Sequence, residues 1–200
     1  MMDLTGQFNH VNESKMKYSI DWLKQQYQQG EEVKYYFFWG HTPKIPGVVD
    51  KSCLSQWFPN PFTVEGTLYH TAEHWMMAGK AKLFNDAHAL EEILKTTKPG
   101  TAKAWGRKVK NFDADVWKAK AYDLVVEGNV HKFSQHKQLK DFLLKTGNQV
   151  IVEASPRDFI WGIGLGQDRK EAQHPNTWRG TNLLGFALME VRDKLLNQAA

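Results

Sequence analysis

Several features that would narrow the function of this chain are scarce or missing. Its 200 residues contain one cysteine, Cys53, so no internal disulfide can form and we expect a reducing compartment. No apolar run approaches the roughly 18 residues that a membrane span needs. The segment from Met1 to His10 is polar and lacks the apolar core of a signal peptide. The sequence therefore predicts a cytoplasmic protein with no membrane partner.

A large excess of charge and a phosphate-binding glycine loop are also missing. The net charge of +4 fits an anionic ligand, but it is well below that of a dedicated nucleic-acid binder. The glycines at 162, 164 and 166 are not followed by Gly-Lys-Ser/Thr, which excludes a P-loop. Aromatic residues are plentiful instead, at 12% with eight tryptophans. Flat rings suit a site that stacks a planar base.

Hydrophobic periodicity predicts many helices and few strands. Helices are expected over 14–29, 71–84, 86–95, 99–109, 113–133, 137–145 and 182–197, and strands over 34–39, 62–68 and 149–154. Thr71 can cap the second helix and Gly147 can end the sixth. Strands and helices do not alternate regularly, so we expect an α+β fold, predominantly helical, and not a doubly wound sheet. The polar residues 1–13 are expected to form an arm.

The segment from Val152 to Gly164 is the most informative one. An apolar run over 150–152 is typical of a buried strand, and a Ser-Pro turn signal follows. Arg157, Asp158 and Trp161 then place a cation, a carboxylate and a large ring where the strand gives way to a glycine-bearing loop. Loops held by a rigid scaffold often carry functional groups. A structural alternative stays open, in which Asp158 caps the turn and Trp161 fills the core.

A second candidate region is the predicted helix that begins after Thr71. Glu73 falls in its first turn, where the helix dipole favours an ionised carboxylate. Glu73, Met77 and Lys80 share one face, so a carboxylate and an ammonium flank one surface. Two alternatives remain open. Glu73 could only complement the dipole, or residues 70–74 could form an H-x-x-E-H zinc site, although no third ligand is marked by spacing.

Cations and a tryptophan follow on the next two predicted helices. Lysine and arginine gather over 103–110, and a face containing Arg107 could hold phosphate. The alternative is a solvated surface, the more frequent use of such residues. Trp117 lies at the start of the next helix and is either a core residue or one wall of a site.

Motifs that occur in order along the chain carry a resemblance to a known family. They are Leu-Ser-Gln-Trp-Phe-Pro-Asn-Pro-Phe at 54–62, Ala-Glu-His-Trp-Met-Met at 72–77, Gly-Arg at 106–107, Lys-Phe-Ser-Gln at 132–135, Leu-Leu-Lys-Thr-Gly at 143–147, Glu-Ala-Ser-Pro-Arg-Asp at 153–158, Trp-Gly-Ile-Gly at 161–164, Arg-Gly-Thr-Asn-Leu-Leu-Gly at 179–185 and Leu-Met-Glu-Val-Arg at 188–192. From about Tyr35 to Leu196 the chain resembles the NADAR domain family, also called YbiA-like. The resemblance implies a single such domain over 34–200, preceded by an arm and helix over 1–33.

The resemblance also implies an enzyme, a hydrolase that acts as an N-glycosidase. Members of the family hydrolyse the N-glycosidic bond of early riboflavin-pathway intermediates, the ribosylamino-pyrimidine 5′-phosphates. Others remove ADP-ribose from guanine, as a nucleotide or within nucleic acid. A third interpretation is a non-catalytic module that binds ADP-ribose or a related nucleotide. The implied partner is a nucleotide-like small molecule, and the mechanism requires no cofactor and no metal. The sequence does not predict an oligomeric state.

Motif positions carry the family's functional residues onto this chain. Glu73 matches the essential glutamate and Trp117 a functional tryptophan, and Asp158 and Trp161 match residues of the glycine-bearing loop. We expect Glu73 to stabilise an oxocarbenium-like cation and to activate water, with Asp158 assisting. Trp117 and Trp161 are expected to flank the departing base.

Further residues are expected to hold the rest of the substrate. Lys80, Arg107 and Arg157 are the cations expected to bind a 5′-phosphate or diphosphate. Asn182 is expected to bind substrate or to cap the last helix. The chain departs from the family pattern at Arg157, where many members carry an aromatic or another polar residue. It also extends the short bacterial form over 37–53. Both departures bear on the substrate and not on the reaction.

Overall fold

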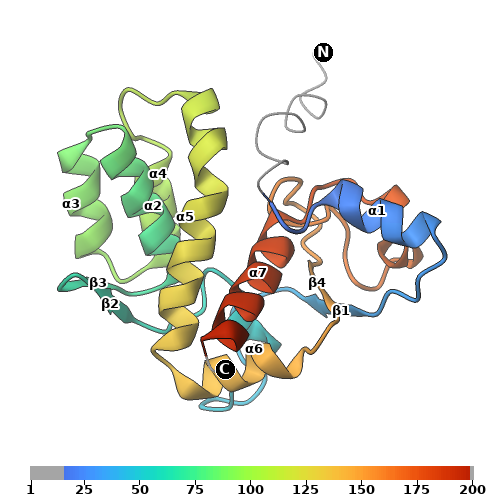
Figure 1. The fold of residues 1–200 in the computed structure, drawn as a ribbon. Helices are drawn as coiled ribbons and strands as arrows, with labels where there is room; N and C mark the ends of the chain where they lie inside the picture. The colour runs from blue at the N-terminus through green and yellow to red at the C-terminus, as the bar shows by residue number, and fades with distance from the viewer. Residues whose placement is uncertain (1–15, 199–200) are drawn as a thin grey trace.

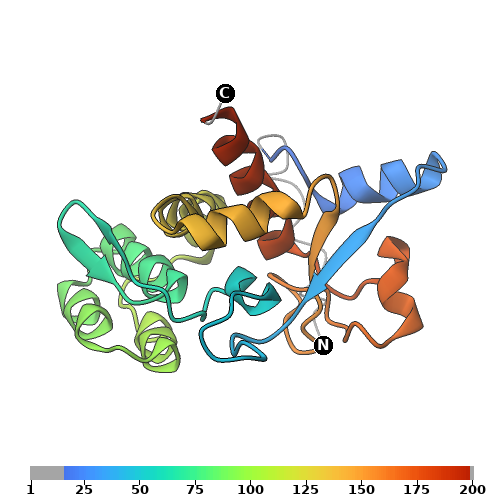
Figure 2. The same ribbon diagram turned by 90° about the horizontal axis from the view of Figure 1, so that it is seen from below.

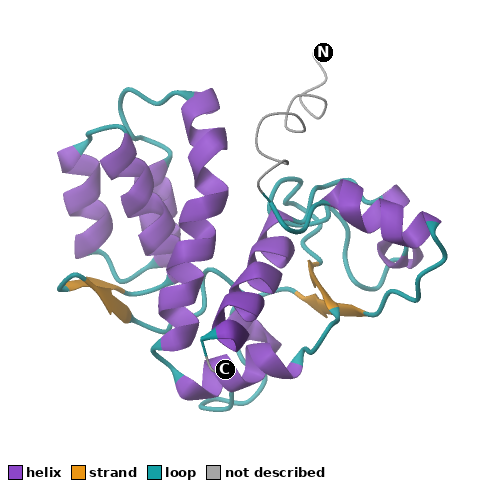
Figure 3. Ribbon diagram, in the orientation of Figure 1, coloured by secondary structure: helices purple, strands orange, loops and turns teal. Residues whose placement is uncertain are grey.

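The structure is a computed structural model that describes residues 16–198, so the arm expected over residues 1–13 lies outside the described part. The elements are α1 (Ile20–Gln28), β1 (Tyr35–Phe38), η2 (Lys51–Leu54), β2 (Phe62–Val64), β3 (Thr67–Tyr69), α2 (Ala72–Leu83), α3 (Ala87–Lys95), α4 (Pro99–Gly106), α5 (Ala114–Ser134), α6 (Lys137–Lys145), β4 (Val150–Glu153), η3 (Lys170–Gln173), η4 (Pro175–Thr177) and α7 (Leu183–Asn197). Helices dominate and the strands are short, which confirms the α+β, predominantly helical class (Figure 3).

Helices α5 and α7 lie side by side in the middle of the molecule (Figure 1). On one side of this pair, α2 packs against α3, α4 and α5. On the other side, α7 packs against β4, which pairs with β1. Helix α6 contacts both central helices at one end of the pair (Figure 2). The two central helices therefore join two groups of elements, and each group supplies one side of the site described below.

The strands form two small sheets. β1 pairs with β4 in parallel, with Phe38 opposite Glu153, and the apolar residues 150–152 are buried as predicted. β2 and β3 form an antiparallel hairpin. Its turn residues Glu65 and Gly66 both have positive φ, 48° and 78°, as a tight hairpin turn requires. β4 ends at Glu153, and the chain enters the glycine-bearing loop after the buried residues Ala154 and Ser155.

Three details of the secondary-structure prediction were wrong. In the described residues α1 begins at Ile20 and not at 14, because the Ser19 side chain caps it by accepting from the backbone N–H of Trp22. α4 ends at Gly106 and not at 109. Val116, predicted in the buried stripe of α5, is 42% exposed, because residues 110–116 all lie on the surface.

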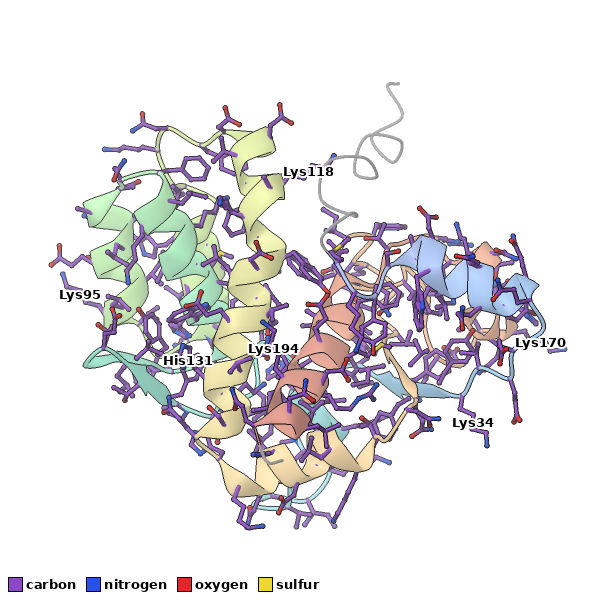
Figure 4. The ribbon with its side chains drawn as sticks, viewed as in Figure 1. Lys34, Lys95, Lys118, His131, Lys170 and Lys194 are labelled. Atoms are coloured by element: carbon purple, nitrogen blue, oxygen red, sulfur yellow. The ribbon has the colours of Figure 1, made fainter. Side chains whose placement is uncertain are left out.

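The outer surface carries solvated charges. Lys34, Lys95 and Lys170 are exposed, and Lys95 lies on the opposite side of the molecule from the other two (Figure 4). In the part of the chain that the structure describes, no helix combines the length and the apolar composition that a bilayer crossing needs.

Candidate active site

A cavity of about 570 Å³ lies between the two groups of elements. One side, the helical wall, comes from α2, α4 and the segments that follow α4. The other side, the loop wall, comes from the end of β4 and the loop after it. The helical wall presents Glu73, Met76, Met77, Lys80, Lys103, Gly106, Arg107 and Trp117, and the loop wall presents Glu153, Arg157, Asp158, Phe159, Ile160 and Trp161.

Helix α2 sets the face that the helical wall presents. Thr71 is its N-cap, as predicted, and its Oγ1 accepts from the backbone N–H of His74 at 3.4 Å. Glu73, Met77 and Lys80 all line the cavity, which confirms that they share one face. A Cβ added at Gly106 would lie 2.0 Å from the Met77 sulfur, so a larger residue there would have to displace the Met77 side chain where α4 crosses this face.

Glu73 is buried inside the helical wall. Its side chain is 6% exposed, and its Oε1 has no hydrogen-bond partner. The Nζ of Lys103 lies 3.9 Å from that oxygen. Burial raises the pKa of Glu73, whereas Lys103, the Trp57 side chain and Arg107 all act to lower it. Burial has the larger effect, so the cavity holds a carboxyl group whose pKa is raised and whose ionised form Lys103 and Arg107 partly stabilise.

A second cation of the helical wall lies over aromatic rings. The Nζ of Lys80 is 5.4 Å from the ring centre of Trp117 and 4.0 Å from that of Phe112, both within cation–π range. Burial lowers the pKa of Lys80. Arg107 is exposed at the cavity edge. An aromatic surface and two cations therefore lie next to each other on this wall.

The loop wall owes its shape to Asp158. Its Oδ1 accepts from the backbone N–H groups of Ile160 at 2.9 Å and Trp161 at 2.7 Å, which closes an Asx turn. Asp158 therefore does cap the turn, and it lines the cavity as well. Trp161 is partly buried and Arg157 is exposed, and both line the same cavity. The structural and the functional interpretations of this segment are compatible.

Asn182 needs a correction, because it lies outside the cavity. It is fully buried, and its side chain makes no capping bond to α7. Its Nδ2 donates to the carbonyl of Ile151 at 2.9 Å, and its Oδ1 accepts from the backbone N–H of Glu153 at 2.9 Å. These two bonds satisfy the amide, so its visible role is to fix the end of β4 and with it the position of Glu153.

Two charged residues of the cavity were not assigned a role from the sequence. Glu153 lines the loop wall, and burial, followed by the charges of Asp158 and Glu73, raises its pKa to about 8. The available signal was its place directly after a buried strand. Lys103 was one of several cations over 103–110, and spacing could not distinguish it from the rest. The structure places it beside Glu73.

The turn after η2 completes the cavity with Ser55, Gln56 and Trp57. Helix α5 holds this turn from beneath. The buried Nζ of Lys132 donates to the carbonyl of Ser55 at 2.8 Å, and Asn129 donates to the Gln56 side-chain oxygen at 2.8 Å. The Gln56 Nε2 is buried and has no partner. Buried polar atoms are normally satisfied, and three unpartnered ones, Gln56 Nε2, Glu73 Oε1 and Glu153 Oε2, belong to residues that line this cavity.

Comparison with known proteins identifies the family of this chain. The sequence profile of the NADAR domain matches residues 37–196. The chain belongs to the NADAR domain family. An N-glycosidase of Acanthamoeba polyphaga mimivirus is 43% identical, over 82% of this chain and 98% of the relative. An N-glycosidase of Nostoc punctiforme is 31% identical, over 72% of this chain and 86% of the relative.

A solved structure has the same fold. The NMR structure of the Escherichia coli protein YbiA superimposes with a TM-score of 0.68 at 26% identity, over 84% of this chain and 88% of YbiA. The NADAR domain of this chain thus has a single YbiA-like fold, as the motifs implied. Its cavity gathers residues that are far apart in sequence. The residues assigned to the site from the sequence that line it are Glu73, Lys80, Arg107, Trp117, Arg157, Asp158 and Trp161.

In the H-x-x-E-H string of this NADAR domain, Glu73 lines the cavity but the two histidines do not. His70 and His74 have ring centres 5.7 Å apart, and neither lines the cavity. The Nδ1 of His74 is 2.8 Å from the Thr71 hydroxyl, and burial lowers the pKa of His74 to about 4. Over residues 16–198, no group of three or more His, Cys, Asp and Glu side chains could hold a metal ion.

Proposed function

We propose that this protein hydrolyses the N-glycosidic bond of a phosphorylated riboside, the class that includes the ribosylamino-pyrimidine 5′-phosphates of early riboflavin synthesis. The relatives are N-glycosidases, and the protein is a hydrolase of that class. The observation that carries the proposal is Glu73, a buried carboxylate that lines the cavity, with Oε1 unpartnered and a lysine 3.9 Å away.

The reaction places positive charge where Glu73 can stabilise it. Breaking the bond between C1′ of ribose and nitrogen gives the sugar oxocarbenium character, and a nearby carboxylate in a dry site stabilises that charge strongly. Glu73 also takes a proton from the water that adds to C1′. Asp158 lies on the opposite wall with one oxygen engaged in its own turn, and we assign its other oxygen to the ribose hydroxyls or the water.

The remaining cavity residues match the two ends of such a substrate. Trp117 and Trp161 provide flat rings for the departing base, one from each wall. Lys80 and Arg107 on the helical wall and Arg157 on the loop wall provide cations for the phosphate. Phe159 and Ile160 line the cavity yet are 49% and 38% exposed, so the cavity mouth is open to a larger ligand.

Product analysis tests the proposal. The purified protein is incubated with a ribosylamino-pyrimidine 5′-phosphate and, separately, with guanosine nucleotides that carry ADP-ribose on the base. Mass spectrometry follows the free base and the sugar phosphate. We expect release of ribose 5-phosphate from the first. Release of ADP-ribose alone would replace the proposed substrate by the second class, and no release from either would reject hydrolysis of both.

A further inference from the structure

Glu153 differs from the other carboxyl groups of the cavity because no partner neutralises it. Its Oε2 is buried without a hydrogen bond, and among the described residues it forms no ion pair. The backbone around it is rigid. Its N–H donates to Asn182 at 2.9 Å, and its carbonyl accepts from the N–H of Ile163 at 3.0 Å. The carboxyl group is therefore held in a fixed place on the loop wall.

Burial raises the pKa of both Glu73 and Glu153, but the groups around the two carboxyls differ. Glu73 lies in the first turn of α2, where the helix dipole favours negative charge, and Lys103 is 3.9 Å away. Glu153 ends a strand, which offers no such dipole, and two of its three charged neighbours are carboxylates. Two carboxyl groups whose environments differ in this way are typical of an acid and base pair.

Three charged residues act on Glu153, and they come from three different segments. Asp158 is on its own loop, Glu73 on α2 and Lys103 on α4. Phe38, its partner on β1, carries no charge. The other cations that line the same cavity are Lys80, Arg107 and Arg157. Burial is the largest effect and the two carboxylates add to it, so the pKa rises to about 8 in spite of Lys103. At neutral pH the group is mostly a neutral acid.

Building on the function proposed above, we propose that Glu153 is the general acid that protonates the departing nitrogen. As the C1′–N bond breaks, its electron pair moves to nitrogen and the carboxyl proton of Glu153 passes to the same atom. Water adds its oxygen to C1′ and gives a proton to Glu73. Proton exchange with solvent then restores both carboxyl groups. One water is consumed, and a free amine and a free sugar phosphate result, so atoms and charge balance.

The chemistry requires such a donor. A nitrogen that leaves a ribosylamine without a proton departs as an unstable anion, whereas a protonated nitrogen leaves as a neutral amine. General acid catalysis of this kind is worth about 10²- to 10⁴-fold. Among the cavity carboxyl groups, Glu153 is the one with no cation in contact and no hydrogen bond to its side chain. Asp158 already accepts two backbone N–H groups.

The first test is the pH profile of Glu153→Gln. The substrate is a ribosylamino-pyrimidine 5′-phosphate, and Glu127→Gln on the exposed face of α5 is the matched control. For the wild type we expect kcat/KM to fall as the pH rises through about 8. For Glu153→Gln we expect a loss of about 10²-fold or more at neutral pH and no alkaline fall. A role in folding alone would not remove the alkaline limb.

The second test needs no substrate. Carbon NMR of the glutamate carboxyl groups is followed against pH in the ligand-free wild type and in Glu73→Gln, which keeps Glu153. We expect a carboxyl that titrates near 8 in the wild type, and in Glu73→Gln one that still titrates above the ordinary acidic range but at a lower pH, because the charge of Glu73 is gone. Titration of every glutamate in the ordinary acidic range would overturn the proposal even if Glu153→Gln failed to fold.

The outcomes separate this proposal from the one on which it rests. An inactive wild type rejects the proposed substrate class, and the general acid with it. An active wild type whose Glu153→Gln variant keeps its rate and its alkaline limb rejects the general acid alone. An active wild type with a slow variant that has lost that limb supports both.

Discussion

The two walls of the cavity are built by different means. On the helical wall, the helix period itself places Glu73 and Lys80 on one face of α2. On the loop wall, backbone groups hold the chain in place. The carbonyl of Trp161 accepts from the N–H of Leu184 at 3.1 Å, and that of Ile160 accepts from the N–H of Leu183 at 3.2 Å. The positions on the helical wall are thus set by the helix itself, whereas the loop wall depends on backbone hydrogen bonds from the start of α7.

Glycines show how closely the loop wall is packed. A Cβ at Gly180 would lie 2.3 Å from the carbonyl oxygen of Gly162, and one at Gly185 would lie 2.0 Å from that of Ile151. Both obstacles are backbone atoms, which cannot rotate away. The segment after 178 therefore packs closely against the backbone of the loop wall and fixes its position. We expect Glu73→Gln on the helical wall to lower activity but not stability. Substitution of a glycine behind the loop wall should lower both activity and stability.

The largest effect should come from the helical wall, with Glu73→Gln. We expect kcat to fall about 10³-fold, equivalent to about 4 kcal/mol, because no negative charge remains beside C1′. Folding should be intact, since glutamine has the same shape and burial already disfavours the ionised carboxylate. Steady-state kinetics, a binding measurement and thermal unfolding check this. Glu91→Gln, exposed on α3, is the control. Retained turnover would contradict the assignment and favour a binding module.

The second-largest effect should come from Gly180→Ala, behind the loop wall, which should lower both stability and activity. Overpacking against rigid backbone typically costs about 1–3 kcal/mol of unfolding free energy. Since residues 159 and 162 are the ones displaced, kcat/KM should fall as well. Gly100→Ala on α4 is the matched control, because its Cβ would be 3.6 Å from the Trp57 ring, an ordinary contact. There alanine favours the helix, and we expect a gain of up to about 1 kcal/mol.

Denaturant unfolding and kcat/KM, measured on both glycine variants, decide the matter. Equal changes in stability and activity for Gly180→Ala and Gly100→Ala would contradict this prediction. They would show that the loop wall depends on the packing behind it no more than the helical wall does.

The same contrast explains what the sequence could predict. The face of α2 was predictable because period and N-cap are local signals: Thr71 caps the helix, and Glu73 and Lys80 follow at fixed spacing. The motifs of the family resemblance also placed Asp158 and Trp161, which line the cavity. The roles of these residues stay predictions until the variants are measured.

The role of Asn182 could not be predicted, because its partners in β4 are about 30 residues away and no local pattern links them. The same contact fixes the backbone of Glu153, so the position of its carboxyl in the cavity could not be predicted from the sequence either. Lys132 was quoted only as part of a motif. Its complete burial, with two carbonyls as partners, follows from the packing of α5 against the turn after η2.

The smallest and sharpest effect concerns Lys103→Met on the helical wall. Lys103 lowers the pKa of Glu73, so removing it should raise that pKa further. Glu73 acts as a carboxylate, so the acid limb of kcat/KM should move to higher pH. Lys103 also lowers the pKa of Glu153, so the alkaline limb should move in the same direction. Lys103 is 39% exposed, and added salt should reduce the shift.

Lys108→Met is the control, because Lys108 lies over Trp105 and outside the cavity. Equal shifts in both variants would show a general effect of net charge, whereas a rate loss at every pH without a shift would mean that Lys103 contacts the substrate itself.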